Sequence, residues 1–268
     1  MQTIWAVGLF LLGLGVGSFA NVLIYRVPRR LSFVAPRSFC PSCGHVIRPY
    51  DNIPLISYLW LRGRCRDCGA GISIRYPVVE LLCGLLWLGV FWHPGLPWTP
   101  AMPSWTLQAE LWPGLFFVTV LLVISGIDLD EQIIPNRIIL PAIVVGLAAL
   151  GAVSLVRGDY HVILHAVYGM LIGGGFLGII AFLAPRGMGM GDAKLAAFLG
   201  IFMGFYILAG LLIAFLLGSI GGIILLAAKR KGRRDRIPFG PFLALGGALA
   251  LFWGEPLYRL YRSLFHLG

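Results

Sequence analysis

Long stretches of apolar residues, separated by short polar segments, dominate the hydropathy pattern of the chain. Eight nearly uncharged apolar runs lie at 3–25, 77–92, 107–127, 138–156, 162–184, 193–205, 206–228 and 238–256. Most of them approach the roughly 20 residues that an α-helix needs to cross a bilayer. The pattern predicts an all-α polytopic membrane protein with about eight transmembrane helices.

Three of these runs, 193–205, 206–228 and 3–25, allow more than one interpretation. The stretch 193–228 is continuous apolar sequence, too long for one span and short for two. Gly200, Gly204 and Gly210 are candidate positions for a turn within it, because glycine adopts backbone conformations that other residues avoid. The run 3–25 exceeds the usual ~7–15 apolar residues of a signal peptide and has no basic segment before it. We therefore expect it to be retained as a helix.

Composition supports the membrane assignment and sets apart one polar segment. Hydrophobic residues make up 59% of the chain, charged residues 12%, and the mean hydropathy is +0.88. Soluble domains hold roughly 25% charged residues, so a soluble fold is excluded. The polar segment between the first two runs holds four of the five cysteines. The sequence predicts a transmembrane helix at 1–25, a cytoplasmic metal-binding module at 26–76 and a membrane domain at 77–268.

The net charge of +10 is explained by membrane topology. Short cytoplasmic loops are enriched in lysine and arginine. An outside N-terminus places all but Arg157, Arg259 and Arg262 of the 21 basic residues on the cytoplasmic side. The basic residues flank apolar segments and are not interleaved with aromatic residues, so they do not indicate nucleic-acid binding. We expect these basic residues to lie at the surface of a lipid bilayer. The sequence predicts no oligomeric state.

Four cysteines in the polar segment have the spacing of a zinc site. They form two C-x2-C pairs separated by 21 residues, Cys40, Cys43, Cys65 and Cys68. A glycine follows each pair and suits the tight turn that lets two thiolates reach one ion. Two disulfides are the alternative, but they rarely persist in the reducing cytosol. The pattern predicts one structural zinc ion, which would stabilise a module too small to fold unaided. Cys83, inside an apolar run, is predicted to be a packed core residue.

Acidic residues are scarce, and four of them lie at predicted helix ends. Asp128, Asp130 and Glu131 lie where the third apolar run ends, in GIDLDEQIIPN, and Asp192 precedes the sixth run, in GMGMGDAKL. Ionisable groups at the membrane boundary are expensive and indicate function. A helix cap is the simpler alternative for Asp192.

Two carboxylates that lie close together in a cleft can share one proton. The ionised partner can then take a proton from water, while the protonated partner polarises a peptide carbonyl. The chain has no H-E-x-x-H zinc motif and no G-x-S-x-G motif. The sequence therefore favours an aspartic protease with Asp128 and Asp192 as the catalytic pair.

Two functions of other classes remain open at this point. An ion-coupled transporter or channel could use boundary carboxylates to carry protons or cations, with the zinc module as a regulatory domain. Transport sites tend to lie near the middle of the bilayer and between repeats, whereas both acidic clusters here lie at helix ends. A membrane scaffold that recruits partners through the zinc module would not need Asp128 or Asp192.

The motifs together resemble those of the bacterial prepilin peptidases, membrane aspartic proteases of the G-x-G-D type. The resemblance covers nearly the whole chain and is carried by GSFANVLIYRVP (17–28), CPSCG, DNIPLISYLWLRGRCRDCG, ISIRYPVVE (72–80), DLDEQIIPN, GMGMGDAKL and IPFGPFLALGG (237–247). In this family the catalytic aspartates correspond to Asp128 and Asp192. The zinc cysteines correspond to Cys40, Cys43, Cys65 and Cys68.

The resemblance implies a function at the cytoplasmic face of the bacterial inner membrane. Family members cut the short basic leader from type IV prepilins and type II secretion pseudopilins, just after a glycine. Many also methylate the new N-terminus with S-adenosylmethionine as donor. A basic leader calls for acidic partners, so we expect Asp130 and Glu131, and Asp51 and Asp67 on the zinc module, to contact it.

Overall fold

A computed structural model describes residues 2–35, 37–93, 106–185, 187–228 and 238–264. The described chain is all-helical, as predicted, and its only β pairings are isolated bridges between Phe39 and Val46 and between Arg64 and Gly71. It divides into two compact units, residues 1–92 and 93–268.

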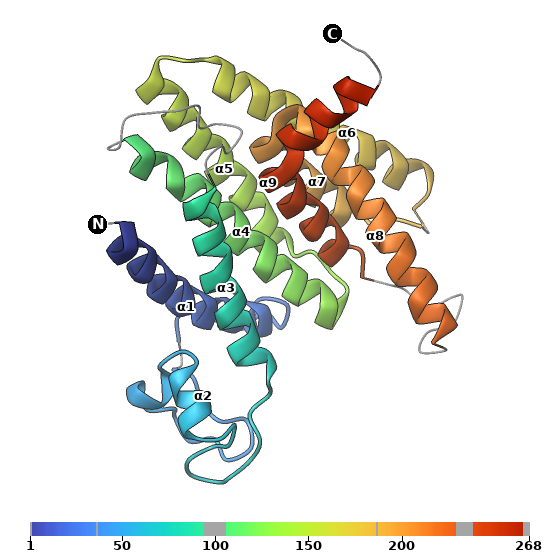
Figure 1. The fold of residues 1–268 in the computed structure, drawn as a ribbon. Coiled ribbons are helices and arrows are strands. Elements are labelled where there is room, and N and C mark those ends of the chain that lie inside the picture. The colour runs from blue at the N-terminus through green and yellow to red at the C-terminus, as the bar shows by residue number, and fades with distance from the viewer. Residues whose placement is uncertain (1, 36, 94–105, 186, 229–237, 265–268) are drawn as a thin grey trace. The chain divides into compact units, whose positions relative to one another are not determined.

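The first unit consists of two long helices joined by a polar segment. Helix α1 (Gln2–Arg26) packs against α3 (Arg75–Trp92), and the segment between them holds a short 3-10 helix, η1 (Pro49–Asn52), and the short helix α2 (Ile56–Trp60) (Figure 1). Glycine permits the close approach of the long pair, because a Cβ at Gly17 would lie 2.7 Å from the Cα of Glu80. Cys83 is fully buried in α3, which confirms its predicted place in the core.

The described residues of the second unit form a bundle of six helices, of which five are long and α7 is short. They are α4 (Thr106–Glu131), α5 (Asn136–Arg157), α6 (His161–Leu183), α7 (Met190–Met203), α8 (Ile207–Ala227) and α9 (Gly240–Leu264). Helix α7 contacts each of the other five and is the central element of the bundle. Its contact with α6 is the closest, since a Cβ at Gly169 or Gly200 would collide with the opposing backbone.

The apolar stretch 193–228 is divided into two helices, as the sequence predicts. The break lies at Gly204, where φ is 54°, and a short 3-10 turn, η2 (Gly204–Tyr206), connects α7 to α8. Of the three glycines that could host the turn, Gly204 is the one that leaves the helical conformation. A side chain at this φ would be strained.

The described helices make the chain a multi-pass membrane protein. Six helical segments are long and apolar enough to cross a bilayer, with 190–227 counted as one segment, and Gly240–Gly254 is a shorter apolar helix. Helix α7 has 14 residues, so it is only about 21 Å long at 1.5 Å per residue and falls short of a 30 Å hydrocarbon core. Eight helices occupy the eight predicted runs, while the number that fully cross the membrane stays a prediction.

Candidate active site and metal centre

Asp128 lies in the last turn of α4 and points into the bundle. Only 5% of the Asp128 surface is exposed. The carboxylate oxygen Oδ2 accepts a hydrogen bond of 2.8 Å from the backbone N–H of Gly240, the first residue of α9. The neighbouring Asp130 and Glu131 are exposed. The helix end therefore buries one carboxylate and leaves the next two at the surface.

Asp192 lies in the first turn of α7 and is half-buried. Its backbone N–H donates to the carbonyl of Gly189 at 3.1 Å, and its Oδ2 accepts from the N–H of Gly189 at 3.2 Å. This reciprocal pair caps α7, so the simpler role considered from the sequence is present. A cap also fixes the orientation of the carboxylate, so it is compatible with a chemical role.

Two contacts join the segment after α4 to the start of α7. A Cβ at Gly191 would lie 3.0 Å from the Cβ of Ile134, so the glycine lets the chain approach this loop closely. Lys194 of α7 donates a hydrogen bond of 2.8 Å from its Nζ to Oδ1 of Asn136, the first residue of α5. The DEQIIPN and GMGMGD segments, about 60 residues apart in sequence, are adjacent in the fold.

Aromatic packing within the bundle fixes α4 against α7. Phe117 of α4 stacks on Phe198 with ring centroids 5.6 Å apart and meets Phe202 at 4.8 Å, and all three side chains are fully buried. Asp128 lies in the last turn of α4 and Asp192 in the first turn of α7, where the close approach of Gly191 to Ile134 joins the two chain segments. The structure therefore brings together the two carboxylates that the sequence singled out.

The four cysteines of the two C-x2-C pairs form a single cluster. Their sulfur atoms all lie within 4.8 Å of one another, and the Sγ atoms of Cys40 and Cys68 are 3.8 Å apart. A tetrahedral zinc site with Zn–S distances of about 2.3 Å separates its sulfurs by about 3.8 Å. None of the cysteines is in a disulfide. The cluster could hold a metal ion such as zinc, and the disulfide alternative is not what the structure shows.

Each C-x2-C pair is the turn of a small hairpin with the same backbone pattern. In the first, the N–H of Gly44 donates to the carbonyl of Cys40 at 2.8 Å, and in the second the N–H of Gly69 donates to the carbonyl of Cys65 at 2.9 Å. Both glycines have positive φ values, 73° and 71°. The glycines that follow the cysteines are thus required by the turn, as the sequence predicts.

The first turn already favours a thiolate. The backbone N–H of Cys43, and then that of Ser42, lowers the pKa of Cys40 to about 6. The thiolate is the form of cysteine that binds metal ions. The backbone therefore favours the thiolate at Cys40, whereas burial and the neighbouring sulfurs raise the pKa of Cys43 to about 12.

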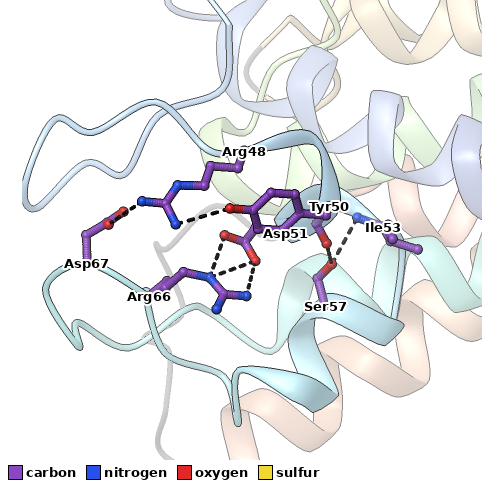
Figure 2. A network of polar contacts seen from close by, with 7 residues as sticks. All are labelled: Arg48, Tyr50, Asp51, Ile53, Ser57, Arg66 and Asp67. Carbon is purple, nitrogen blue, oxygen red and sulfur yellow. Dashed lines mark hydrogen bonds and ion pairs between the residues drawn. The ribbon is translucent and has the colours of Figure 1, made fainter.

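A network of charged residues connects the second hairpin to η1 (Figure 2). Arg66, between Cys65 and Cys68, donates from Nε and Nη2 to both carboxylate oxygens of Asp51, at 2.6–3.1 Å. This fork is the strong geometry for an arginine–carboxylate pair. The hydrogen bond from Arg66 holds the pKa of Asp51 below its usual range. The pair therefore stabilises the module at neutral pH and loses that contribution as the pH falls through the lowered pKa.

The same network changes one expectation from the sequence. Arg48 contacts Asp67 at 3.5 Å and Tyr50 at 3.2 Å, and only 9% of the Asp51 side chain is exposed. Asp51 and Asp67 are therefore occupied by arginines of the module, which was not foreseen because these partners are distant in sequence. Asp51 organises the module, whereas the Asp67 side chain keeps 31% of its surface exposed beside Arg48. The leader contact expected of both residues stays a prediction.

Sequence reasoning did not identify Glu80, a buried carboxylate of α3. Its residue is 8% exposed, and its Oε2 accepts a hydrogen bond of 2.9 Å from the N–H of Leu55. Leu55 has a φ of 59°, a conformation that costs a non-glycine residue about 1–3 kcal/mol. The bond ties the segment before α2 to the long helix α3. The ISIRYPVVE motif contained the signal, but its spacing alone indicated no role.

The fold and these two clusters define a class of protein: a polytopic membrane protein with a pair of carboxylates at adjoining helix ends and a four-cysteine cluster that could hold a metal ion. The chain belongs to the type IV leader peptidase family, whose model matches residues 115–227. A second model, the bacterial peptidase A24 N-terminal domain, matches residues 11–94. This membership favours a peptidase over the transporter and the scaffold.

Relatives from several bacteria match most of the chain. The Pseudomonas aeruginosa protein is 37% identical over 94% of this chain and 91% of its own length. The Bacillus subtilis protein is 33% identical over 96% and 97%, and the Myxococcus xanthus protein is 42% identical over 86% and 66%. Each is named prepilin leader peptidase/N-methyltransferase. No solved structure matches the chain.

Proposed function

We propose that the protein is a membrane-embedded aspartic endopeptidase that removes the basic leader from type IV prepilins and type II secretion pseudopilins. The observation that carries this proposal is the placement of Asp128 and Asp192 at the adjoining ends of α4 and α7. The names of the relatives support the choice of substrate. Cleavage takes place after a glycine at the membrane boundary, where the leader joins the apolar helix that lies in the bilayer.

The two carboxylates share the work of hydrolysis. One is ionised and takes a proton from a water molecule, whose oxygen attacks the carbonyl carbon of the scissile bond. The other is protonated and hydrogen-bonds the carbonyl oxygen. The C–N bond then breaks as a proton passes to the leaving amine, and one proton remains shared by the pair. Asp192 is the more exposed of the two residues, since Asp128 is buried.

The metal centre has a structural role in this proposal. Four thiolates would come from Cys40, Cys43, Cys65 and Cys68 and would hold one zinc ion without an open position for substrate. When bound, the ion cross-links the two hairpins of a small polar module. Hydrolysis does not pass through the metal.

The arginine network is expected to support metal binding. Changing Asp51 to Asn removes the charge that fixes Arg66 beside the second cysteine pair. The pair orients the hairpin that carries Cys65 and Cys68 and does not contact a sulfur itself. We therefore expect zinc affinity to fall about tenfold, the lower end of the effect of direct ligand partners. Competition with a chromophoric chelator measures this. Asp67→Asn is the matched control, with a smaller effect because its contact is longer and more exposed. Equal zinc retention by Asp51→Asn and the unaltered protein would contradict this role.

We also propose that the protein methylates the N-terminal amine that cleavage exposes. The relatives carry N-methyltransferase in their names. S-adenosylmethionine would supply the methyl group. No cluster of the described residues is assigned to this donor, and the cleavage chemistry is independent of it.

The active site is proposed to face the cytoplasm, with the N-terminus outside the inner membrane. The excess of basic residues in the loops at this end supports that orientation. Ile133 and Met190 are 47% and 55% exposed at the site end, and Leu155 is 84% exposed at the opposite end of α5. Cysteines introduced at 133 and 190 should react with an impermeant maleimide only in inverted vesicles. A cysteine at 155 should react only in spheroplasts, and the reverse pattern would invert the topology.

The function can be tested in a bacterium that lacks its own leader peptidase. Co-expression of this chain with a type IV prepilin should convert the prepilin to a shorter mature pilin. A prepilin whose glycine before the cleavage site is replaced by a bulky residue should stay unprocessed. If the unaltered prepilin also stays full length while the chain is present in the membrane, the proposed function fails.

A further inference from the structure

The segment 238–242, which the cleavage chemistry does not use, is firmly held against α8. Phe239 stacks on Phe215 with ring centroids 5.4 Å apart. The ring of Phe242 lies over Gly221, where a Cβ would come within 2.7 Å of it. Two aromatic side chains on either side of Gly240 therefore fix the start of α9. The backbone between them has little freedom to move.

The first turn of α9 offers one backbone donor to the rest of the bundle. Initial N–H groups of a helix lack partners within the helix. Pro241 has no N–H, and Phe242 and Leu243 both donate to the carbonyl of Phe239, at 3.1 and 3.0 Å. The N–H of Gly240 remains, and it donates to Oδ2 of Asp128 at 2.8 Å.

Glycine is required at position 240 by this contact. A Cβ there would lie 2.8 Å from Oδ2 of Asp128 and 3.1 Å from its Cβ and Cγ. The Asp128 side chain is short and buried, so it has little room to withdraw. The φ of Gly240 is not positive, so the backbone itself would accept an alanine. Space beside the carboxylate, rather than backbone conformation, demands glycine.

The contact treats the two oxygens of Asp128 differently. Oδ2 receives a charge-assisted hydrogen bond at the positive end of a helix. Within the described residues, Asp128 makes no other side-chain hydrogen bond. Oδ1 is thereby left for water or substrate. Asp192 has a longer bond of 3.2 Å to its own loop, so the two members of the pair are held by different means.

We propose that Gly240 is a positioning residue of the active site: its N–H holds Oδ2 of Asp128 so that Oδ1 faces the reacting groups, and its missing side chain leaves room for that carboxylate. This inference rests on the proposed role of Asp128 in cleavage. It assigns a function to the PFGPF sequence. The two phenylalanines anchor the segment, and the glycine between them meets the aspartate.

The hydrogen bond can be tested without reference to activity. Phe239–Gly240 is the single Phe–Gly pair in the sequence, so labelling phenylalanine with ¹³C at the carbonyl and glycine with ¹⁵N isolates one amide resonance. We expect the Gly240 amide proton to lie downfield and to move upfield in Asp128→Asn, because the acceptor loses its charge. Asp159→Asn, at the other end of the bundle, is the control and should leave it in place. An amide resonance that is insensitive to Asp128→Asn overturns the proposal.

The positioning role is tested by Gly240→Ala. A displacement of a reacting group by about 1 Å can cost about 10²-fold in rate, so we expect kcat for prepilin cleavage to fall about 100-fold with KM changed less than about twofold. Gly175→Ala is the matched control, because a Cβ there meets nothing within 4 Å. A kcat within about threefold of the unaltered protein overturns the positioning role, even if the resonance responds.

These two readouts separate this inference from the proposed function. If the unaltered protein cleaves no prepilin, the proposed function fails while the amide resonance still reports the contact. If Gly240→Ala does not fold, the resonance in the unaltered protein and in Asp128→Asn decides the hydrogen bond.

Discussion

Replacing either Asp128 or Asp192 by asparagine is expected to abolish leader cleavage. Neither half of a carboxylate pair that shares a proton can act alone, and general acid–base groups contribute about 10²–10⁴-fold each. We expect kcat to fall by at least about 10³-fold, the range for a pair that works as a unit. Processing of a purified prepilin, followed over hours by gel mobility, measures this loss.

The substitutions are expected to leave the fold intact. An asparagine at 128 still offers an oxygen to the N–H of Gly240, and an asparagine at 192 still caps α7 through Gly189. Asp159→Asn makes the same chemical change in the loop between α5 and α6 and should retain full activity. Near-normal processing by either active-site variant would remove the aspartic protease mechanism. Asp130→Asn should matter less, since Asp130 lies exposed beside the pair.

The second large effect is expected at the metal centre. Changing Cys40 and Cys43, or Cys65 and Cys68, to serine should abolish zinc binding and unfold the module. Structural zinc sites contribute about 10–16 kcal/mol of apparent binding free energy in small zinc-finger peptides. The small polar segment has few buried apolar residues to replace this contribution. Metal analysis should return one zinc per chain for the unaltered protein and none for either double variant. Protease sensitivity of the module should rise in parallel.

Cys83 provides the control for this experiment. It is fully buried in α3 and does not belong to the four-sulfur cluster. Cys83→Ala should therefore retain one zinc per chain. Zinc-free purified protein with its four clustered thiols paired as disulfides would contradict the metal assignment and, with it, the cytoplasmic location of the module.

The long helices were predictable because each corresponds to one long, continuous apolar run in the sequence. The break at Gly204 was predictable in kind, since the run 193–228 is too long for one span. Its position among three candidate glycines was decided by tertiary packing of α7 against the other helices. The short length of α7 agrees with the short run 193–205, because the continuous apolar stretch leaves too few residues for two full spans.

The residues of the two sites were predictable from the sequence, but several of their contacts were not. The cysteines are close in sequence and have a spacing that reflects their geometry, so all four were predictable. Asp128 and Asp192 stood out because acidic residues are rare in this chain. The pairing of Arg66 with Asp51 and the contact of Gly240 with Asp128 were not predictable. The first joins charges 15 residues apart, and the second uses a backbone group that lies 112 residues from its acceptor.

The central claim is tested most directly by mass spectrometry of both cleavage products. The purified protein is incubated in detergent with a full-length type IV prepilin and S-adenosylmethionine, and both fragments are then analysed. The account predicts two fragments that meet at one bond, a basic leader that ends in glycine and a mature pilin with one added methyl group. Both should be absent when Asp128 or Asp192 is replaced by asparagine. An intact prepilin after incubation with the folded, zinc-loaded protein, or the same two fragments from the asparagine variants, would contradict it.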